Sequence, residues 1–242
     1  MTVSSLTHLV VIPTYNEIEN IEKFLLEISK LDVSVLVVDD NSPDGTGNLV
    51  TTLSKNSNKI NLLQRSEKLG LGSAYRDGFK WGIENNFLYF VEMDADFSHR
   101  FEDLESMLTV STDNDVVIGS RYISGGGSLG WDTKRKVLSK LANLTSKILL
   151  KSKTNDMTSG FRCYSSTSLK KIKYYNTQSD GYSFQIEMTM RCEVLKLKIS
   201  EIPIIFTERR LGKSKMSKKI VYEALFFLVK NGIKRWLNIK TF

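Results

Sequence analysis

Two carboxylates that are one residue apart, Asp94 and Asp96, follow an apolar run that is typical of a strand. On a strand, residues i and i+2 share a face, so both side chains can project together from its C-terminal end. Like charges this close repel unless a cation or a shared proton lies between them. The pair therefore predicts a Mg²⁺ or Mn²⁺ site that takes its other ligands from water and substrate phosphates. The alternative is a solvated turn after a strand.

Polar clusters also follow the first two strands that we expect along the chain. Residues 13–17 interrupt the apolar run 8–13, and residues 39–44 follow the β-branched run 33–38. In open α/β sheets, ligands bind beyond the C-terminal ends of the strands. All three polar clusters fall at such ends, which favours one shared site. The acids that open the second cluster can hydrogen-bond the base or ribose of a nucleotide.

Hydrophobic periodicity places the other elements around these clusters. Apolar residues recur at helical spacing from Ile18 to Ile28, with Asn16 as the expected cap. Strands that alternate with helices in this way predict βαβ units and an α/β fold with a mostly parallel sheet between helices. The expected strands are 8–13, 33–38, 60–64, 87–93, 115–120 and 199–206, and further helices are expected after Gly70, from Lys134, near Gly181 and over 218–238.

Composition limits the classes of protein that remain. The 242 residues suffice for one large α/β domain, and 41% hydrophobic with 25% charged residues is ordinary for a soluble protein. A net charge of +7 suits an anionic partner: nucleic acid, a phosphorylated metabolite or an anionic membrane. Cys163 and Cys192 have no metal-binding spacing and are expected in the core. No signal peptide or membrane-spanning run is visible, so we expect a cytosolic protein or one on the cytosolic face of a membrane.

Two common nucleotide-binding motifs are missing from the sequence. No Gly-x-Gly-x-x-Gly follows the first expected strand, and no Gly-Lys-Ser/Thr loop occurs. An ordinary dinucleotide-binding domain and a P-loop enzyme are therefore disfavoured.

Several of these segments together resemble the family 2 glycosyltransferases of GT-A fold, and among them the dolichyl- or polyprenyl-phosphate mannosyltransferases. The resemblance runs from about Leu9 to Ser217 and implies a catalytic domain over 1–217. The apolar periodicity of the residues after it predicts a C-terminal amphipathic helix within 218–242. The segments that carry the resemblance are Val11-Ile12-Pro13-Thr14-Tyr15-Asn16-Glu17, residues 37–46, Gly70-Leu71-Gly72-Ser73-Ala74-Tyr75 and Met93-Asp94-Ala95-Asp96.

The resemblance implies a donor site for GDP-mannose with Mg²⁺ or Mn²⁺ on its diphosphate. Asp94 and Asp96 would bind the metal, with Ser98 helping directly or through water. Residues 206–215 match the family's Phe-x-x-Arg-x-x-Gly-x-Ser-Lys segment; from the residues alone they are a mobile basic loop or a solvated charge run. The implied nucleotide-sugar-binding residues are Pro13, Tyr15, Glu17, Asp39, Asp40, Lys68, Gly70, Asp94, Arg209, Ser214 and Lys215.

The resemblance also implies that Arg121, Arg135 and Ser139 hold the phosphate of a polyprenol acceptor. Guanidinium groups suit this task because they offer directional, paired donors, although Arg135 alone would also fit a solvated helix charge. A phosphate monoester, with a second pKa of about 6, is largely dianionic at neutral pH and needs no general base. The expected reaction is an inverting single displacement that releases GDP, with Asp96, Arg121, Arg135 and Arg209 as its catalytic residues.

Several alternatives stay open at this point. Glu187 is either a carboxylate near the acceptor or the structural partner of an arginine, and His99 lies behind the acid pair or at the surface. The glycine-rich residues 124–128 are a mobile lid or a plain connector. The last helix binds a membrane surface, packs on the domain or contacts a partner, including a separate membrane protein.

The same residues also bear on the alternative functions. The nearest is transfer from UDP-glucose or another donor to a lipid phosphate or a polysaccharide. Nucleic-acid binding is disfavoured because the carboxylates would repel backbone phosphates. A non-catalytic scaffold is disfavoured as well, because it does not need the acidic and arginine motifs.

Overall fold

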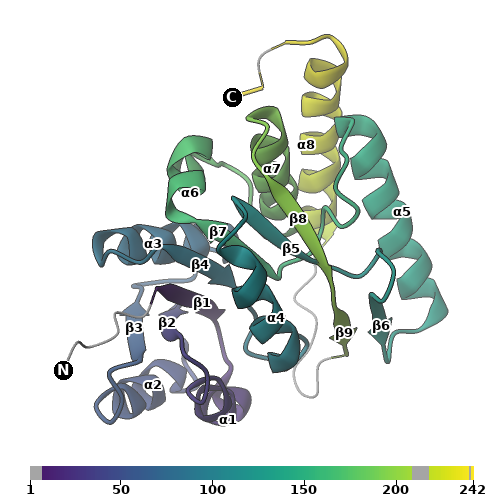
Figure 1. Cartoon of the computed structure of the whole chain (residues 1–242). Coiled ribbons are helices and arrows are strands. Elements are labelled where there is room, and N and C mark those ends of the chain that lie inside the picture. The colour runs from purple at the N-terminus through teal and green to yellow at the C-terminus, as the bar shows by residue number, and fades with distance from the viewer. Residues whose placement is uncertain (1–6, 209–217, 240) are drawn as a thin grey trace.

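The computed structural model describes residues 7–208, 218–239 and 241–242. A seven-stranded sheet with the order β3-β2-β1-β4-β7-β5-β8 forms its centre, and only β7 runs antiparallel to its neighbours (Figure 1). The expected α/β fold with a mostly parallel sheet is confirmed. The strands are β1 (His8–Thr14), β2 (Ser34–Asp39), β3 (Ile60–Gln64), β4 (Tyr89–Glu92), β5 (Val116–Ser120), β7 (Arg162–Ser165) and β8 (Ile199–Pro203).

Helices cover both faces of this sheet. Val10 and Ile12 of β1 pack towards one set of helices, and Leu9 and Val11 pack towards the other set. Burial on both faces explains why the strand is a continuous apolar run without alternation. The first face carries α1 (Ile18–Ile28), α2 (Thr46–Ser54) and α4 (Phe101–Ser111), and the second carries α3 (Leu71–Glu84), α6 (Ser166–Ile172) and α7 (Gly181–Val194).

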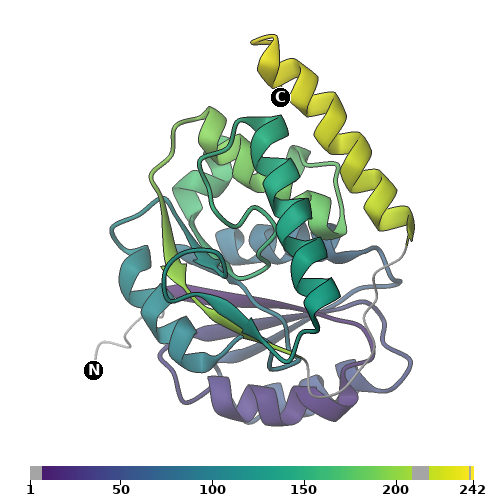
Figure 2. The same cartoon turned by 90° about the vertical axis from the view of Figure 1, so that its right-hand side faces the viewer.

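Two long helices, α5 (Thr133–Leu150) and α8 (Lys218–Trp236), lie outside α7 (Figures 1 and 2). A small apolar cluster joins the three helices through Leu150 of α5, Ile186 and Met190 of α7, and Leu228 of α8. The apolar stripe of α5 does not point into this cluster. The five side chains of the stripe are between 51% and 61% exposed: Val137, Leu138, Leu141, Leu144 and Ile148.

The predicted strand 199–206 is divided in two. The chain leaves the main sheet after β8, and β9 (Ile205–Thr207) pairs in parallel with the short strand β6 (Gly127–Leu129). The end of the glycine-rich segment 124–128 is thus part of a two-stranded ribbon. Gly126 permits the close turn before β6, because a Cβ there would lie 2.4 Å from the carbonyl oxygen of Ser120.

The start of α1 differs from the expectation that Asn16 caps it. Asn16 has a φ of +58°, and the N-cap position belongs to Glu17, whose side chain does not cap the helix. The loop after β2 satisfies the first turn instead, since the Ile18 N–H donates to Asp44 Oδ2 at 3.1 Å. The predicted cap was therefore wrong, because a distant loop supplies the acceptor.

Candidate active site

The acid pair lies at the end of β4 in a cavity of about 270 Å³. The cavity is built at the edge where parallel strands end, and Arg121 and Arg135 also line it. Acids and arginines that the sequence separates by 25 residues or more therefore share one space. The residues that close the cavity include Pro13, Glu17, Tyr75, Trp131, Tyr182, Gln185 and Phe206.

The turn that carries the acids is held in place by its own neighbours. The Ser98 N–H donates to Asp96 Oδ1 at 3.0 Å, and the Asp94 N–H donates to His99 Nδ1 at 3.4 Å. The His99 ring is buried and stacks on Phe161 with 4.8 Å between the centroids. His99 is therefore buried rather than at the surface, and it also lines the acid cavity.

The oxygen groups of this turn fit a hard divalent cation. The Ser98 hydroxyl is fully buried beside Asp96, and it has no hydrogen-bond partner among the described residues. The described ranges contain no group of three or more His, Cys, Asp or Glu residues that could hold a metal. A cation on Asp94 and Asp96 would thus need further oxygens from water and a diphosphate, which is how Mg²⁺ and Mn²⁺ are usually bound.

Arg121 follows β5 and is held by a buried carboxylate. Its Nε and Nη2 donate to Asp156 Oδ2 and Oδ1, both at 2.8 Å, and Nη2 also donates to Thr158 Oγ1 at 2.8 Å. Burial favours the neutral acid, but the adjacent guanidinium lowers the pKa of Asp156 below its usual range. The Nη1 group makes no hydrogen bond to any described residue, so it remains available to a ligand.

Arg135 lies in the first turn of α5, next to a tryptophan. Asp132 caps the helix by accepting from the Arg135 N–H at 2.7 Å. The guanidinium carbon lies 4.3 Å from the centre of the Trp131 ring, and Nη1 lies 3.1 Å from Glu208 Oε1. Ser139, one turn further along α5, has its hydroxyl 2.7 Å from the Tyr122 hydroxyl.

An apolar groove of about 620 Å³ runs between α5 and α8. It is lined by Leu138, Leu141 and Ala142 of α5 and by Ala224, Leu225 and Leu228 of α8. Its polar end consists of residues that also line the acid cavity: Arg121, Trp131, Arg135, Thr158 and Tyr182. Arg121 and Arg135 therefore both lie where a polar cavity meets an apolar groove.

The two acids after β2 differ in their capacity to bind a ligand. The Asp39 carboxylate accepts four hydrogen bonds, from Thr14, Gln64 and twice from Ser42, so both of its oxygens are saturated. Asp39 therefore stabilises the conformation of its own loop, and its contact with a nucleotide stays a prediction. Asp40 is bound at Oδ1 by Arg65, while Oδ2 has only a long contact of 3.4 Å with the Gly70 N–H.

Other expected donor residues lie on neighbouring loops. Lys68 Nζ is 3.9 Å from the centre of the Tyr15 ring. Gly70 has a φ of +97° and lies against Asp180, whose Oδ1 accepts from the Gly72 N–H at 2.5 Å. Asp180, which the sequence analysis missed, thus joins the starts of α3 and α7. The expected residues Arg209, Ser214 and Lys215 lie outside the described residues.

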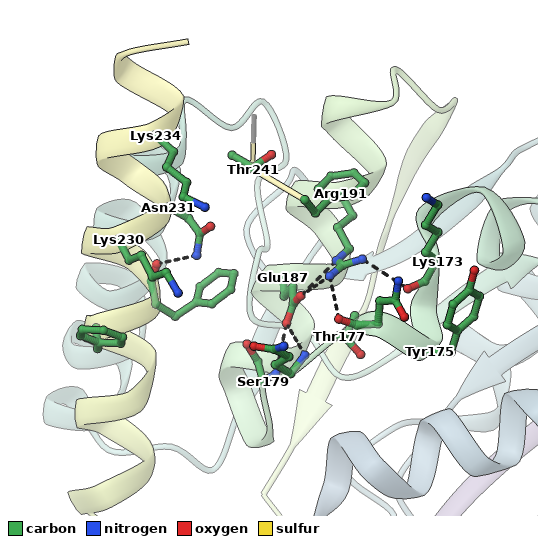
Figure 3. A pocket seen from close by; sticks show the side chains of 15 residues that line it. Lys173, Tyr175, Thr177, Ser179, Glu187, Arg191, Lys230, Asn231, Lys234 and Thr241 are labelled. Carbon is green, nitrogen blue, oxygen red and sulfur yellow. Dashed lines mark hydrogen bonds and ion pairs between the residues drawn. The ribbon is translucent and has the colours of Figure 1, made fainter. Parts of the chain in front are cut away.

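Glu187 is the structural partner of an arginine. Its Oε1 lies 2.7 Å from Arg191 Nη2 in a buried ion pair, and its Oε2 accepts from the Ser179 N–H at 3.1 Å (Figure 3). This pair belongs to a separate hollow that faces α8 and is lined also by Lys230 and Lys234. The alternative of a carboxylate near the acceptor is wrong.

A buried polar group beneath the site was also missed. Glu92, in β4, is fully buried; burial raises its pKa to about 8, although the charge of Arg162 opposes the shift. Its oxygens make no hydrogen bond of ordinary geometry within the described residues. Arg162, also fully buried, donates to the carbonyl oxygens of Met157, Ser159 and Gln185. The sequence feature that could have revealed this buried group is a glutamate within an otherwise apolar strand.

The fold and the acid pair at the strand ends define a nucleotide-diphospho-sugar transferase of the GT-A class. The structure resembles the mannosyltransferase PcManGT from Pyrobaculum calidifontis in complex with GDP-Man and Mn²⁺, with a TM-score of 0.56 and 14% identity over 96% of this chain and 74% of that chain. Residues 9–173 match the Glycosyl transferase family 2 domain. The chain belongs to this family and is a glycosyltransferase.

Two curated relatives are similar over nearly their whole length. An undecaprenyl-phosphate mannosyltransferase of Micrococcus luteus is 43% identical over 235 residues, which cover 96% of this chain and 97% of that protein. A polyprenol monophosphomannose synthase of Mycolicibacterium smegmatis is 44% identical over 234 residues, which cover 95% of this chain and 88% of that protein.

Proposed function

We propose that this protein transfers mannose from GDP-mannose to the phosphate of a polyprenol, and so forms polyprenyl-phosphate β-mannose and GDP. The observation that carries the proposal is the junction of the acid cavity with the apolar groove at Arg121 and Arg135. A sugar nucleotide needs the polar cavity, and an isoprenoid chain needs the apolar groove. The names of the two curated relatives, an undecaprenyl-phosphate mannosyltransferase and a polyprenol monophosphomannose synthase, describe this kind of transfer.

On the donor side, Asp94 and Asp96, with Ser98 beside them, would hold a divalent cation that also takes oxygens from the diphosphate. The bound cation supplies a Lewis acid for the charge that develops on the departing GDP. Asp40 accepts from the base or ribose with its less occupied oxygen, while Pro13, Tyr15, Glu17, Lys68 and Gly70 shape the donor site. Arg209, Ser214 and Lys215 are proposed to contact the diphosphate from the segment outside the described residues.

On the acceptor side, the free Nη1 of Arg121 donates to the phosphate together with Arg135 and Ser139. The Tyr122 hydroxyl orients Ser139, and Trp131 keeps the Arg135 guanidinium in the site. A phosphate monoester is already ionised near neutral pH, so positioning replaces deprotonation. This arrangement agrees with a site in which the only nearby histidine, His99, is used to fix the turn of the acids.

We further propose that α5 and α8 lie on the cytosolic face of a membrane. No helix in the described part of the chain is both long and apolar enough to cross a bilayer. The exposed stripe of α5 is flanked by the exposed Lys134, Lys136 and Lys140, and α8 exposes Phe226 and Trp236. Apolar side chains beside lysines suit an interface with anionic lipids. Residues 218–242 would then complete the acceptor groove of the catalytic domain 1–217.

The deciding experiment incubates the protein with labelled GDP-mannose, undecaprenyl phosphate and Mg²⁺, and in parallel with labelled UDP-glucose. We expect label in the organic phase with GDP-mannose, and at least about 100-fold less with the Asp96→Asn variant. Label from UDP-glucose alone would reject the mannosyl assignment in favour of the rival donor. Nuclear magnetic resonance of the product should show a β-linkage, and an α-linkage would contradict a single displacement.

A further inference from the structure

We infer that Glu208 is a built-in competitor of the acceptor phosphate for Arg135. In the structure, Glu208 Oε1 lies 3.1 Å from Nη1 of Arg135, a residue that lines both the acid cavity and the apolar groove. The Glu208 carboxylate is therefore paired with the Arg135 guanidinium, which is proposed to bind the acceptor phosphate. This inference depends on the proposed acceptor site and adds a residue to it.

The backbone of Glu208 is held firmly while its side chain is exposed. The Glu208 N–H donates to the Leu129 carbonyl oxygen at 3.0 Å, and the Thr207 N–H donates to the Ser98 carbonyl oxygen at 3.0 Å. Gly130, with a φ of +82°, lets the two segments approach, since a Cβ there would lie 2.8 Å from the Cβ of Glu208. The β6–β9 ribbon thus places this carboxylate beside Arg135 without fixing its rotamer.

The two arginines of the junction have partners of different kinds. The Arg121–Asp156 pair is buried, with side chains 8% and 0% exposed, whereas the Arg135–Glu208 pair has side chains 35% and 50% exposed. Breaking a buried ion pair is costly because it leaves an uncompensated buried charge, whereas an exposed pair contributes little to stability. Arg121 therefore keeps its partner, and Arg135 is the guanidinium that can exchange its partner for a ligand.

The reaction changes the charge of the phosphate that competes with Glu208 for Arg135. When the acceptor binds, the Oε1–Nη1 contact of Glu208 is replaced by a contact between Arg135 and a phosphate oxygen. The monoester carries nearly two negative charges near neutral pH, whereas the mannosylated diester carries one. The carboxylate keeps its single charge throughout. Glu208 thus competes more effectively with the product than with the substrate, and it returns to Arg135 as the product leaves.

Binding of a soluble phosphate monoester to the full chain tests this competition. The Glu208→Gln variant keeps the size of the side chain and removes its charge. By titration calorimetry with decyl phosphate, we expect its Kd to fall by about 2- to 5-fold, which corresponds to an exposed ion pair. The same fall is expected for decyl methyl phosphate, a diester with the charge of the product. Glu105→Gln, an exposed site on α4, makes the same change in net charge and should leave both values unchanged.

A second background separates competition from a general charge effect. In an Arg135→Ala protein, Glu208→Gln should no longer tighten decyl phosphate binding, because the contested guanidinium is gone. Unchanged or weaker binding by Glu208→Gln with Arg135 present would overturn the inference and make Glu208 a residue that orients Arg135. That outcome leaves the proposed function standing if the wild type still transfers mannose. A wild type that neither binds decyl phosphate nor transfers mannose would refute the acceptor site itself, and the competition with it.

Discussion

Arg121 and Asp156 form a buried, two-point ion pair at the edge of the acid cavity, with both nitrogen–oxygen distances at 2.8 Å. Asp156 is itself held in place, because its N–H donates to Glu201 Oε1 at 2.9 Å. The pair fixes the plane of the guanidinium and directs Nη1 away from the protein partners. A conformationally flexible side chain is thereby prepared for an anionic ligand before that ligand arrives.

Replacing Asp156 by Asn should therefore weaken both stability and acceptor binding. The variant leaves the buried Arg121 charge without its counter-ion, and we expect a loss of about 3 kcal/mol in the free energy of unfolding. Urea denaturation measures this loss. Because the folded-state pKa of Asp156 is lowered, its contribution is complete above the unfolded-state pKa of about 3.9 and declines as pH falls below it. The difference between wild type and variant should shrink in that acidic range, and a constant difference would contradict the assignment.

Glu92 should give the opposite dependence on pH. Its pKa is raised to about 8, so between about pH 4.3 and pH 8 the folded protein holds a proton that the unfolded chain has lost. Linkage then makes the free energy of unfolding decrease as pH rises through this window, by about 1.4 kcal/mol per pH unit, and become level above it. The Glu92→Gln variant should lack this slope in denaturation experiments between pH 5 and pH 8. Glu105→Gln serves as the control and should keep the slope of the wild type.

The acid pair can be tested by its response to metal. A Lewis acid is worth several kcal/mol of transition-state stabilisation, so Asp96→Asn should lower mannosyl transfer by about 100-fold or more. Chelation by EDTA should abolish transfer, and Mg²⁺ or Mn²⁺ should restore it. Binding of Mn²⁺ measured by electron paramagnetic resonance, in the presence of GDP, should be lost in parallel. Asp113→Asn, an exposed acid near the opposite ends of the strands, should change neither measurement; full Mn²⁺ binding by Asp96→Asn would place the metal elsewhere.

The proposed membrane face can be separated from the groove. Leu144 is 52% exposed on α5 and does not line the groove, so Leu144→Asp should leave folding and decyl phosphate binding intact. Losing one leucine from the lipid interface removes about 1.5–3 kcal/mol, and binding to phosphatidylglycerol vesicles should fall by about 10-fold or more in a flotation assay. Leu26→Asp, at a similarly exposed site on α1, should float like the wild type. Equal losses in both variants would argue against a docking face on α5.

Gly70 provides a test of the link between α3 and α7. A Cβ at this position would lie within 1.8 Å of Asp180 Oδ2, and the φ of +97° disfavours any side chain. We expect Gly70→Ala to cost about 1–3 kcal/mol in the free energy of unfolding. The matched control is Gly160→Ala, since a Cβ at Gly160 meets no atom within 4 Å. Similar melting temperatures for the two variants would show that Asp180 does not constrain this loop.

Local sequence features were sufficient for much of the fold. A strand that is buried on both faces must be apolar throughout, so 8–13 and 33–38 indicated the positions of β1 and β2. Parallel strands end at one edge, so the polar residues after them had to converge, as Asp94, Asp96 and Arg121 do. These inferences succeed because each depends only on residues a few positions apart and on the rule that orients βαβ units.

Other features were decided by contacts between distant residues. The antiparallel β7 between β4 and β5 is too short to stand out in the sequence, and its place depends on pairing with both neighbours. Asp39 has the same residue type and almost the same position as Asp40, yet its oxygens are consumed by Thr14, Ser42 and Gln64.

The sequence by itself determined the α/β class, the strand-end site and the acid pair, because periodicity and strand-end chemistry are local properties. The tertiary structure alone decided that the stripe of α5 is exposed, with Leu138 and Leu141 lining a groove, and that Arg135 meets Glu208 across 73 residues. Such partners depend on how whole elements pack. Hydrogen-bond and charge complementarity act over a few ångströms of space, whatever the distance along the chain.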